Sequence, residues 1–173
     1  MFSRAAAVAL LFTGAAAAAE FPSKPVRLLL GFPPGGATDL VARAMQPRLS
    51  AALGHQLVID NRPGANGIIG TEMVAKAPPD GHTIVMGNSA PFVWNPSLYA
   101  RLPYDPIKDF APVSQGTRYP YVLIVHPALP VKNVKELVAL AKARPGQLQF
   151  GSSGLGSANH IAGAIFKMVA GVD

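Results

Sequence analysis

The sequence contains no cysteine among its 173 residues. That absence excludes disulfide bonds, a thiolate nucleophile and a lipid anchor on an N-terminal cysteine. Histidine is scarce as well, and its four positions show no spacing typical of a metal site. These are His55, His82, His126 and His160. We therefore predict neither a metal site nor a cofactor.

Runs of one charge are also missing. The chain has 15 Lys and Arg against 9 Asp and Glu, a formal net charge of +6, but the basic residues are scattered along it. No basic run is interleaved with aromatic residues, which argues against nucleic-acid binding. The excess positive charge is compatible with attraction of anionic solutes and equally with an ordinary basic surface.

Only one segment is apolar for long enough to suggest targeting, and it lies at the N-terminus. Arg4 precedes an apolar stretch over residues 5–16, and the alanines at 17–19 match a small-residue cleavage site before Glu20. The stretch is too short and too rich in alanine for a good membrane span. We therefore predict a cleavable signal peptide over residues 1–19 and a soluble protein exported to the periplasm.

The rest of the chain alternates between two hydrophobic patterns. Short apolar runs predict strands at residues 26–32, 57–60, 82–89, 113–117, 121–127 and 147–150. Helical spacing predicts helices at 40–53, 68–76, 134–145 and 158–170, with a short turn at 96–99. Within them, Pro47 predicts a kink or break, and Asn133 with Glu136 predicts a capping box. This alternation predicts an α/β fold with a mainly parallel sheet.

Two segments share one layout of strand, bare loop and helix. The first loop is "GFPPGGATD" at residues 31–39, and the second is "GSSGLGSANH" at residues 151–160. The first turn of a helix has N–H groups without intrahelical partners, and the helix dipole is positive there. Glycines let an anion approach those donors closely. Two such loops that face each other would form an anion-binding cleft.

Rival motifs fit less well. The first loop lacks the lysine of a Walker A motif, and "GLGSAN" at residues 154–159 has Asn159 where a dinucleotide fingerprint needs glycine. Ser157 and His160 are spaced as neighbours on a helix, but no third partner or nucleophile elbow accompanies them. We therefore expect no enzymatic activity.

Four long blocks carry a family resemblance. They are "FPSKPVRLLLGFPPGGATDLVARAM", "IDNRPGANGIIGTEMVAKAPPDGHTIVMGNS", "NPSLYARLPYDPIKDFAPVS" and "GQLQFGSSGLGSANHIAGAIFKMVAGVD". Together they resemble the Bug family, the periplasmic substrate-binding proteins of tripartite tricarboxylate transporters. The resemblance implies a periplasmic-binding-protein-like fold of two Rossmann-like α/β lobes with mainly parallel sheets. The first lobe would span residues 20–125 and the second would begin at residues 126–173.

The resemblance also implies which residues hold the ligand. The positions are Phe32, Pro34, Gly35, Gly36, Ala37, Thr38, Asp39, Asn88, Ser89, Ser152, Ser153, Gly154, Gly156, Ser157 and His160. Some have a purely structural alternative: Asp39 and Ser157 are equally suited to cap helices. Asn88 and Ser89 are suited to close a turn. Arg62 is suited to clamp a carboxylate, but we favour a role in its own loop.

The function implied is that of a receptor. Such a protein binds a small carboxylate between its lobes as a monomer and delivers it to membrane permease subunits without chemistry. Two alternatives stay open, a solute-sensing module for a signalling partner and a truncated remnant without function. Family members are about twice this length, as two lobes require, so we expect the second lobe to be incomplete. The residues do not identify the carboxylate.

Overall fold

The computed structural model describes residues 20–173, so the predicted signal peptide lies outside the described residues. A three-stranded parallel sheet has the strand order β2-β1-β3, with β1 (Val26–Leu30) between β2 (Leu57–Asn61) and β3 (Thr83–Val85). In register, Leu28 lies beside both Ile59 and Ile84. The first three predicted strands and their parallel arrangement are confirmed.

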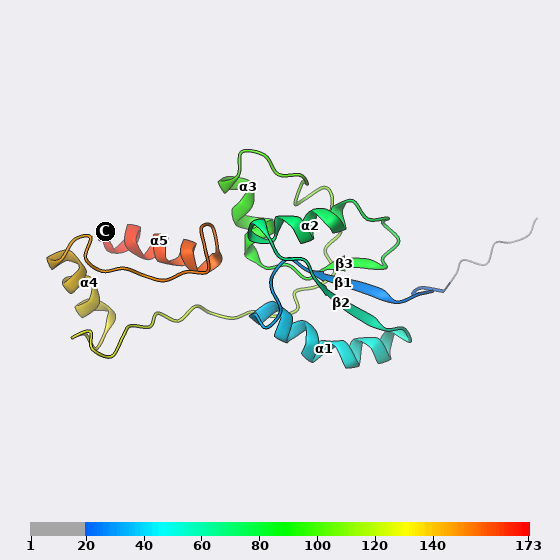
Figure 1. Cartoon of the computed structure of the whole chain (residues 1–173), viewed down its shortest axis with the longest axis horizontal. Helices are drawn as coiled ribbons and strands as arrows, with labels where there is room; N and C mark the ends of the chain where they lie inside the picture. Colours follow the sequence, from blue (N-terminus) through cyan, green and yellow to red (C-terminus); the bar gives the residue numbers. More distant parts are fainter. Residues whose placement is uncertain (1–19) are drawn as a thin grey trace, which may run out of the picture.

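Two helices cover opposite faces of this sheet (Figure 1). They are α1 (Ala37–Leu53), which packs against β2, and α2 (Ile68–Ala75), which packs against β1 and β3. The core lies between one face of the sheet and α1, because alternate residues of β1 are apolar and point to that face. Its members are Val26, Leu28, Leu30, Ala42 and Leu57, with Leu49, Leu53, Ile59, Ile84 and Met86 around them.

Of the kink or break predicted at Pro47, the break does not occur. Helix α1 runs through Pro47 and ends at Leu53, where Gly54 takes a left-handed conformation with φ of 67°. Apolar residues on both sides of Pro47, Ala42 before it and Leu49 after it, pack against the same sheet. That packing holds the two halves of the helix together and offsets the lost backbone hydrogen bond.

Beyond the sheet, the chain forms short helices and then an extended stretch. The π-helix η2 (Ala90–Trp94) continues into α3 (Asn95–Leu98), close to the predicted turn. An extended connecting segment, residues 111–125, then leads to α4 (Val134–Ala143) and α5 (Ala158–Ala170) (Figure 1). We call residues 20–110 the sheet unit and residues 126–173 the C-terminal unit.

The strands predicted at 113–117, 121–127 and 147–150 are absent from the structure. Their apolar side chains are instead open to solvent, with Val122 at 77% and Ile124 at 83% exposure. A strand needs a neighbour that accepts and donates backbone hydrogen bonds. Among residues 20–173 no other strand runs beside these segments, so the apolar pattern alone does not produce a ladder.

Both helices of the C-terminal unit begin at side-chain caps. The Glu136 N–H donates to Asn133 Oδ1 at 3.0 Å, and Glu136 Oε1 accepts from the Asn133 amide, so the predicted pair caps α4. The His160 N–H donates to Ser157 Oγ at 3.4 Å at the start of α5.

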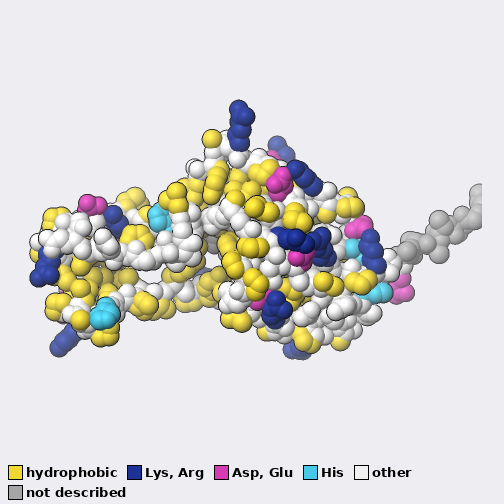
Figure 2. Space-filling model, viewed as in Figure 1, with side chains coloured by type: hydrophobic (Ala, Val, Ile, Leu, Met, Phe, Trp, Pro, Cys, Tyr) yellow, Lys and Arg dark blue, Asp and Glu magenta, His cyan; other side chains and the backbone are white. Residues whose placement is uncertain are grey.

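Packing within the C-terminal unit is sparse, and Figure 2 shows hydrophobic side chains on the surface of this unit. No helix of the described chain is long and apolar enough to cross a membrane.

Candidate ligand-binding cleft

A cleft of about 380 Å³ lies where the sheet unit meets the C-terminal unit. Its sheet-unit wall comes from loops that follow all three strands: Phe32 follows β1, Asn66 follows β2 and Asn88 follows β3. The carboxyl ends of parallel strands meet at one edge of a sheet, so these loops converge there, as ligand-binding loops do in other open α/β folds. These loops of the sheet unit therefore form one wall of the cleft, and the C-terminal unit contributes the other.

The first residues of two helices line this cleft from opposite sides. Ala37 begins α1 and Ala158 begins α5, and Figure 1 shows both helices with their N-terminal ends towards the junction. Helix α1 is preceded by Gly36, which has no side chain to cap the first-turn N–H groups. The lining holds no Lys, Arg, Asp or Glu. The groups that would favour an anion in this lining are therefore the helix N-termini and their N–H groups, not charged side chains.

Eight of the residues predicted for the site lie in the cleft lining. They are Phe32, Pro34, Gly36, Ala37, Thr38, Asn88, Ser153 and Ser157. The other predicted residues lie beside the cleft without lining it: Gly35, Asp39, Ser89, Ser152, Gly154, Gly156 and His160. Arg62 also lies outside the lining and pairs with Asp60, with 2.9 Å between Nε and Oδ1.

Asp39 points into the protein and holds the first loop. Its side chain is 3% exposed, and its carboxylate accepts from the Gly35 N–H at 2.9 Å, from Arg43 Nε at 2.8 Å and from Asn61 Nδ2 at 3.1 Å. The bond from Arg43, followed by that from Gly35, lowers the pKa of Asp39 from 3.8 to about 2. These contacts give Asp39 a structural role, but in the loop before α1 and not as a helix cap, because the N-cap Gly36 has no side-chain cap bond. The carboxylate therefore influences the cleft through the loop that it fixes.

On the opposite wall, the amide of Asn159 organises two serines. Its Oδ1 accepts from Ser153 Oγ at 2.9 Å and from Ser157 Oγ at 2.8 Å. The His160 imidazole does not complete a catalytic pair with Ser157. Its Nδ1 accepts from the Gly156 N–H at 3.3 Å, and its ring stacks on Phe150. The contacts of Asn159 and His160 thus shape the loop before α5.

Sequence reasoning missed several lining residues. Asn66 lies in the loop after β2, and its position at a strand's carboxyl end was a usable signal. Asn159 is in the first turn of α5, inside the loop already singled out. Tyr119 and Tyr121 come from the connecting segment, and their rings pack edge to face with centroids 6.3 Å apart. No sequence pattern marks these tyrosines, because only the tertiary arrangement brings them to the cleft.

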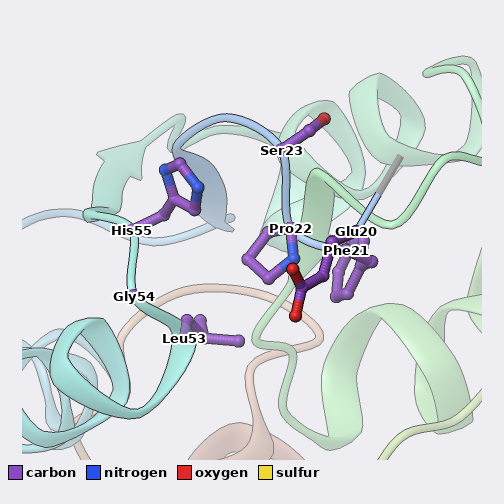
Figure 3. A pocket seen from close by; sticks show the side chains of 7 residues that line it. All are labelled: Glu20, Phe21, Pro22, Ser23, Leu53, Gly54 and His55. Carbon is purple, nitrogen blue, oxygen red and sulfur yellow. The ribbon is translucent and has the colours of Figure 1, made fainter. Parts of the chain in front are cut away.

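A second pocket, about 350 Å³, lies at the other end of the sheet unit, where Leu53, Gly54 and His55 meet residues 20–23 (Figure 3). It contains none of the residues predicted for the site, and its carboxylate, Glu20, is unfavourable for an anion. Within residues 20–173, no three His, Asp or Glu side chains group in a way that could hold a metal ion. The cleft at the junction is therefore the candidate site.

A parallel sheet whose strand-end loops face a second unit across a cleft defines the class of periplasmic-binding-protein-like folds. Residues 41–173 match the Tripartite tricarboxylate transporter family receptor, and the chain belongs to that family. Members of the family are receptors. The Bug resemblance is confirmed, since Protein BugT of Bordetella pertussis is 38% identical over 152 residues, which make up 87% of this chain and 47% of BugT.

Solved structures agree with this assignment. MatC from Rhodopseudomonas palustris with bound malate has a TM-score of 0.78 at 31% identity, covering 88% of this chain and 52% of MatC. R. palustris Rpa4515 with adipate has a TM-score of 0.76 at 37% identity, covering 89% of this chain and 52% of Rpa4515. The chain spans about half the length of the curated relatives it matches.

Proposed function

We propose that this chain binds a small carboxylate in the junction cleft, between a first lobe at residues 20–125 and the start of a second at residues 126–173. The observation that carries the proposal is the pair of helix N-termini, at Ala37 and Ala158, that line one uncharged cleft. The carboxylates bound by MatC and Rpa4515, malate and adipate, support the ligand class.

The ligand's carboxylate would accept hydrogen bonds from the first-turn N–H groups of α1. Gly36 leaves these donors uncapped, and Asp39 takes the N–H of Gly35 and so fixes the loop before them. Such bonds to a carboxylate are charge-assisted and stronger than neutral ones. A second contact at Ser153 and Ser157 would let one ligand bridge both walls. It requires the Ser153 hydroxyl to turn away from Asn159, or the Ser157 hydroxyl to turn away from both Asn159 and the Gly154 carbonyl oxygen.

A protein that binds a carboxylate without transforming it is suited to act as a transport receptor. We infer export to the periplasm by the segment at residues 1–19, action as a monomer without a cofactor, and delivery of the carboxylate to the membrane permease subunits of a tripartite tricarboxylate transporter. Family membership supports this role over catalysis, and the contacts of His160 with Gly156 and Phe150 give no support to a Ser–His nucleophile.

The test is a thermal melt of the chain with malate, adipate or citrate, and with the uncharged adipamide as a matched control. A ligand at about a hundred times its dissociation constant adds roughly 2.7 kcal/mol to the unfolding free energy, a shift of several degrees. We expect a shift with at least one acid and none with adipamide. Equal shifts with adipate and adipamide, or none with any acid, would contradict the proposal.

A variant pair at Gly36 locates the site. Gly36 has φ of −76°, and an added Cβ would lie 3.6 Å from its nearest contact, the Pro33 carbonyl oxygen, so neither the backbone nor a Cβ clash opposes a side chain here. Aspartate and asparagine both cap a helix well, but only aspartate places a negative charge on the α1 donors. We expect Gly36→Asp to abolish the shift with every acid, to a greater extent than Gly36→Asn, while both variants melt no lower than the parent. Unchanged binding in Gly36→Asp would place the ligand elsewhere.

A further inference from the structure

Asn66 joins the two units directly. Its Nδ2 donates to the Gly156 carbonyl oxygen at 2.8 Å, across the junction, and to Asn95 Oδ1 at 2.9 Å within the sheet unit. A side-chain amide nitrogen carries two hydrogens, so both donors of Asn66 are used. This residue also lines the cleft.

Asn95 fixes the orientation of that amide. Its side chain is 0% exposed, and its own Nδ2 donates back to the Asn66 carbonyl oxygen at 3.1 Å. A fully buried amide is stable only with its hydrogen bonds made, so the reciprocal pair is rigid. With one Asn66 hydrogen committed to Asn95, the other points towards Gly156.

The backbone on both sides is adapted to this contact. Asn66 takes the left-handed conformation, with φ of 53° and ψ of 41°, which asparagine tolerates better than most residues. Gly156 has φ of 75°, and a Cβ there would lie 3.1 Å from Leu98 Cδ1 and 3.2 Å from Asn66 Nδ2. The C-terminal unit therefore approaches the sheet unit closely at a position where only glycine fits without strain.

Gly156 is next to the residues that start α5. Its N–H donates to His160 Nδ1, and the following residue, Ser157, caps the helix. A bond to the Gly156 carbonyl therefore fixes where the α5 N-terminus and the Ser157 hydroxyl lie relative to the sheet unit.

We propose that Asn66 is a positioning residue, an interlobe latch anchored by Asn95 that holds the α5 side of the cleft opposite the α1 N-terminus. The latch itself is inferred from hydrogen bonds within the chain and does not depend on a ligand. Its expected effect on ligand affinity rests on the function proposed above. Without the Asn66 amide, the C-terminal unit pivots on the connecting segment and the cleft loses its second wall.

The absence of cysteine makes a distance measurement between the units straightforward. Spin labels at Arg48→Cys on α1 and Lys142→Cys on α4, both exposed, report the separation of the units by pulsed dipolar spectroscopy. The key variant is Asn66→Gly, which keeps the left-handed backbone and removes the amide. The matched control is Ala65→Gly, because Ala65 also has positive φ, at 46°, in the same loop.

We expect a longer and broader distance distribution in Asn66→Gly, and a distribution in Ala65→Gly that matches the parent. An Asn66→Gly distribution that matches the parent would overturn the latch, as would equal broadening in both variants. Titration with adipate and malate then separates the two proposals. Binding by the parent, with a dissociation constant raised about tenfold in Asn66→Gly only, supports both. A parent that binds neither acid contradicts the proposed function for these ligands, while the distances still decide the latch.

Discussion

At the scale of single residues, the Asp39 carboxylate is the group on which the α1 loop depends. Its folded pKa of about 2 is below its usual value of 3.8, because Arg43 and the Gly35 N–H bond to the charged form. A carboxyl whose pKa falls on folding stabilises the native state at pH above its unfolded pKa, and loses that contribution as pH falls through the folded pKa. The contribution of Asp39 should therefore be complete above about pH 5 and disappear between about pH 4 and pH 2.

We expect Asp39→Asn to lower the unfolding free energy at pH 7, and the gap between variant and parent to narrow as pH falls from 4 to 2. Urea unfolding at several pH values measures this gap. Asp173→Asn is the control, because Asp173 is exposed and bonds only to Lys167 among the described residues. A gap that stays constant down to pH 2 would show that the charge of Asp39 does not matter.

The paired tyrosines of the cleft lead to a prediction about ligand shape. Tyr119 and Tyr121 add an aromatic surface to a lining without charged side chains. Burial raises the pKa of the Tyr121 phenol, so this group is neutral at pH 7 and does not repel an anion.

We expect Tyr121→Ala to raise the dissociation constant of adipate about tenfold and that of malate less, since adipate has more methylene groups to bury. Calorimetry measures both, with Tyr99→Ala, outside the cleft, as control; equal losses for the two acids would contradict an apolar contact.

At the scale of elements, three glycines set the distance between β1 and α2. A Cβ at Gly31 would lie 2.8 Å from the Gly67 Cα, and one at Gly70 would lie 2.9 Å from the Gly31 Cα. Both clashes are with backbone, which has no rotamer to change. The loop that carries Phe32 begins at this contact and the loop that carries Asn66 ends there, so the contact fixes their separation.

We therefore expect Gly70→Ala to lower the unfolding free energy by about 1–3 kcal/mol through overpacking, although alanine is the better helix former. Gly116→Ala is the matched control, because its Cβ would meet only Met86 Cε at an ordinary 3.6 Å. Chemical unfolding of the two variants and the parent measures these differences in unfolding free energy. A Gly70→Ala variant as stable as the control would mean that α2 moves away from β1 without cost.

Local patterns predicted the stop at Gly54 and the caps at Asn133 and Ser157, which depend on neighbouring residues. They also predicted β1, β2 and β3, because the apolar runs are visible locally even though the strands pair with segments far away in the sequence. The errors come from interactions that a local pattern does not contain. Packing on both sides overrides Pro47, and the apolar run at 121–127 is no strand because it lacks a neighbour among the described residues.

The residues of the candidate site also fall into those that a local pattern predicts and those that it does not. Phe32 and Ser157 follow from strand–loop–helix patterns, and their place in the cleft was predictable. Asn66, by contrast, acts through Asn95 and Gly156, which are 29 and 90 residues away in sequence. A contact at that range depends on how the two units dock, which helical or strand periodicity does not encode.

At the scale of the whole molecule, burial is unevenly divided between the two units. The sheet unit contains the core around β1, whereas α5 has no buried residue and α4 only Ala141. Helices stabilised by few buried contacts open at low free energy, and their amide protons exchange through such local opening. We expect the α4 and α5 amides to exchange with solvent much faster than those of β1.

Hydrogen exchange followed by mass spectrometry at pH 7 measures this difference peptide by peptide. A ligand that bridges both walls of the cleft should slow exchange at the start of α5 and in the loop before α1, and should leave the far ends of both helices unchanged. The Asn66→Gly variant should exchange faster at residues 154–160 and at the parental rate in β1, because the lost bond is to the Gly156 carbonyl. Equal exchange rates in α5 and β1 of the parent would mean that the two units unfold as one cooperative body, and the C-terminal unit would then owe its stability to the junction rather than to its own packing.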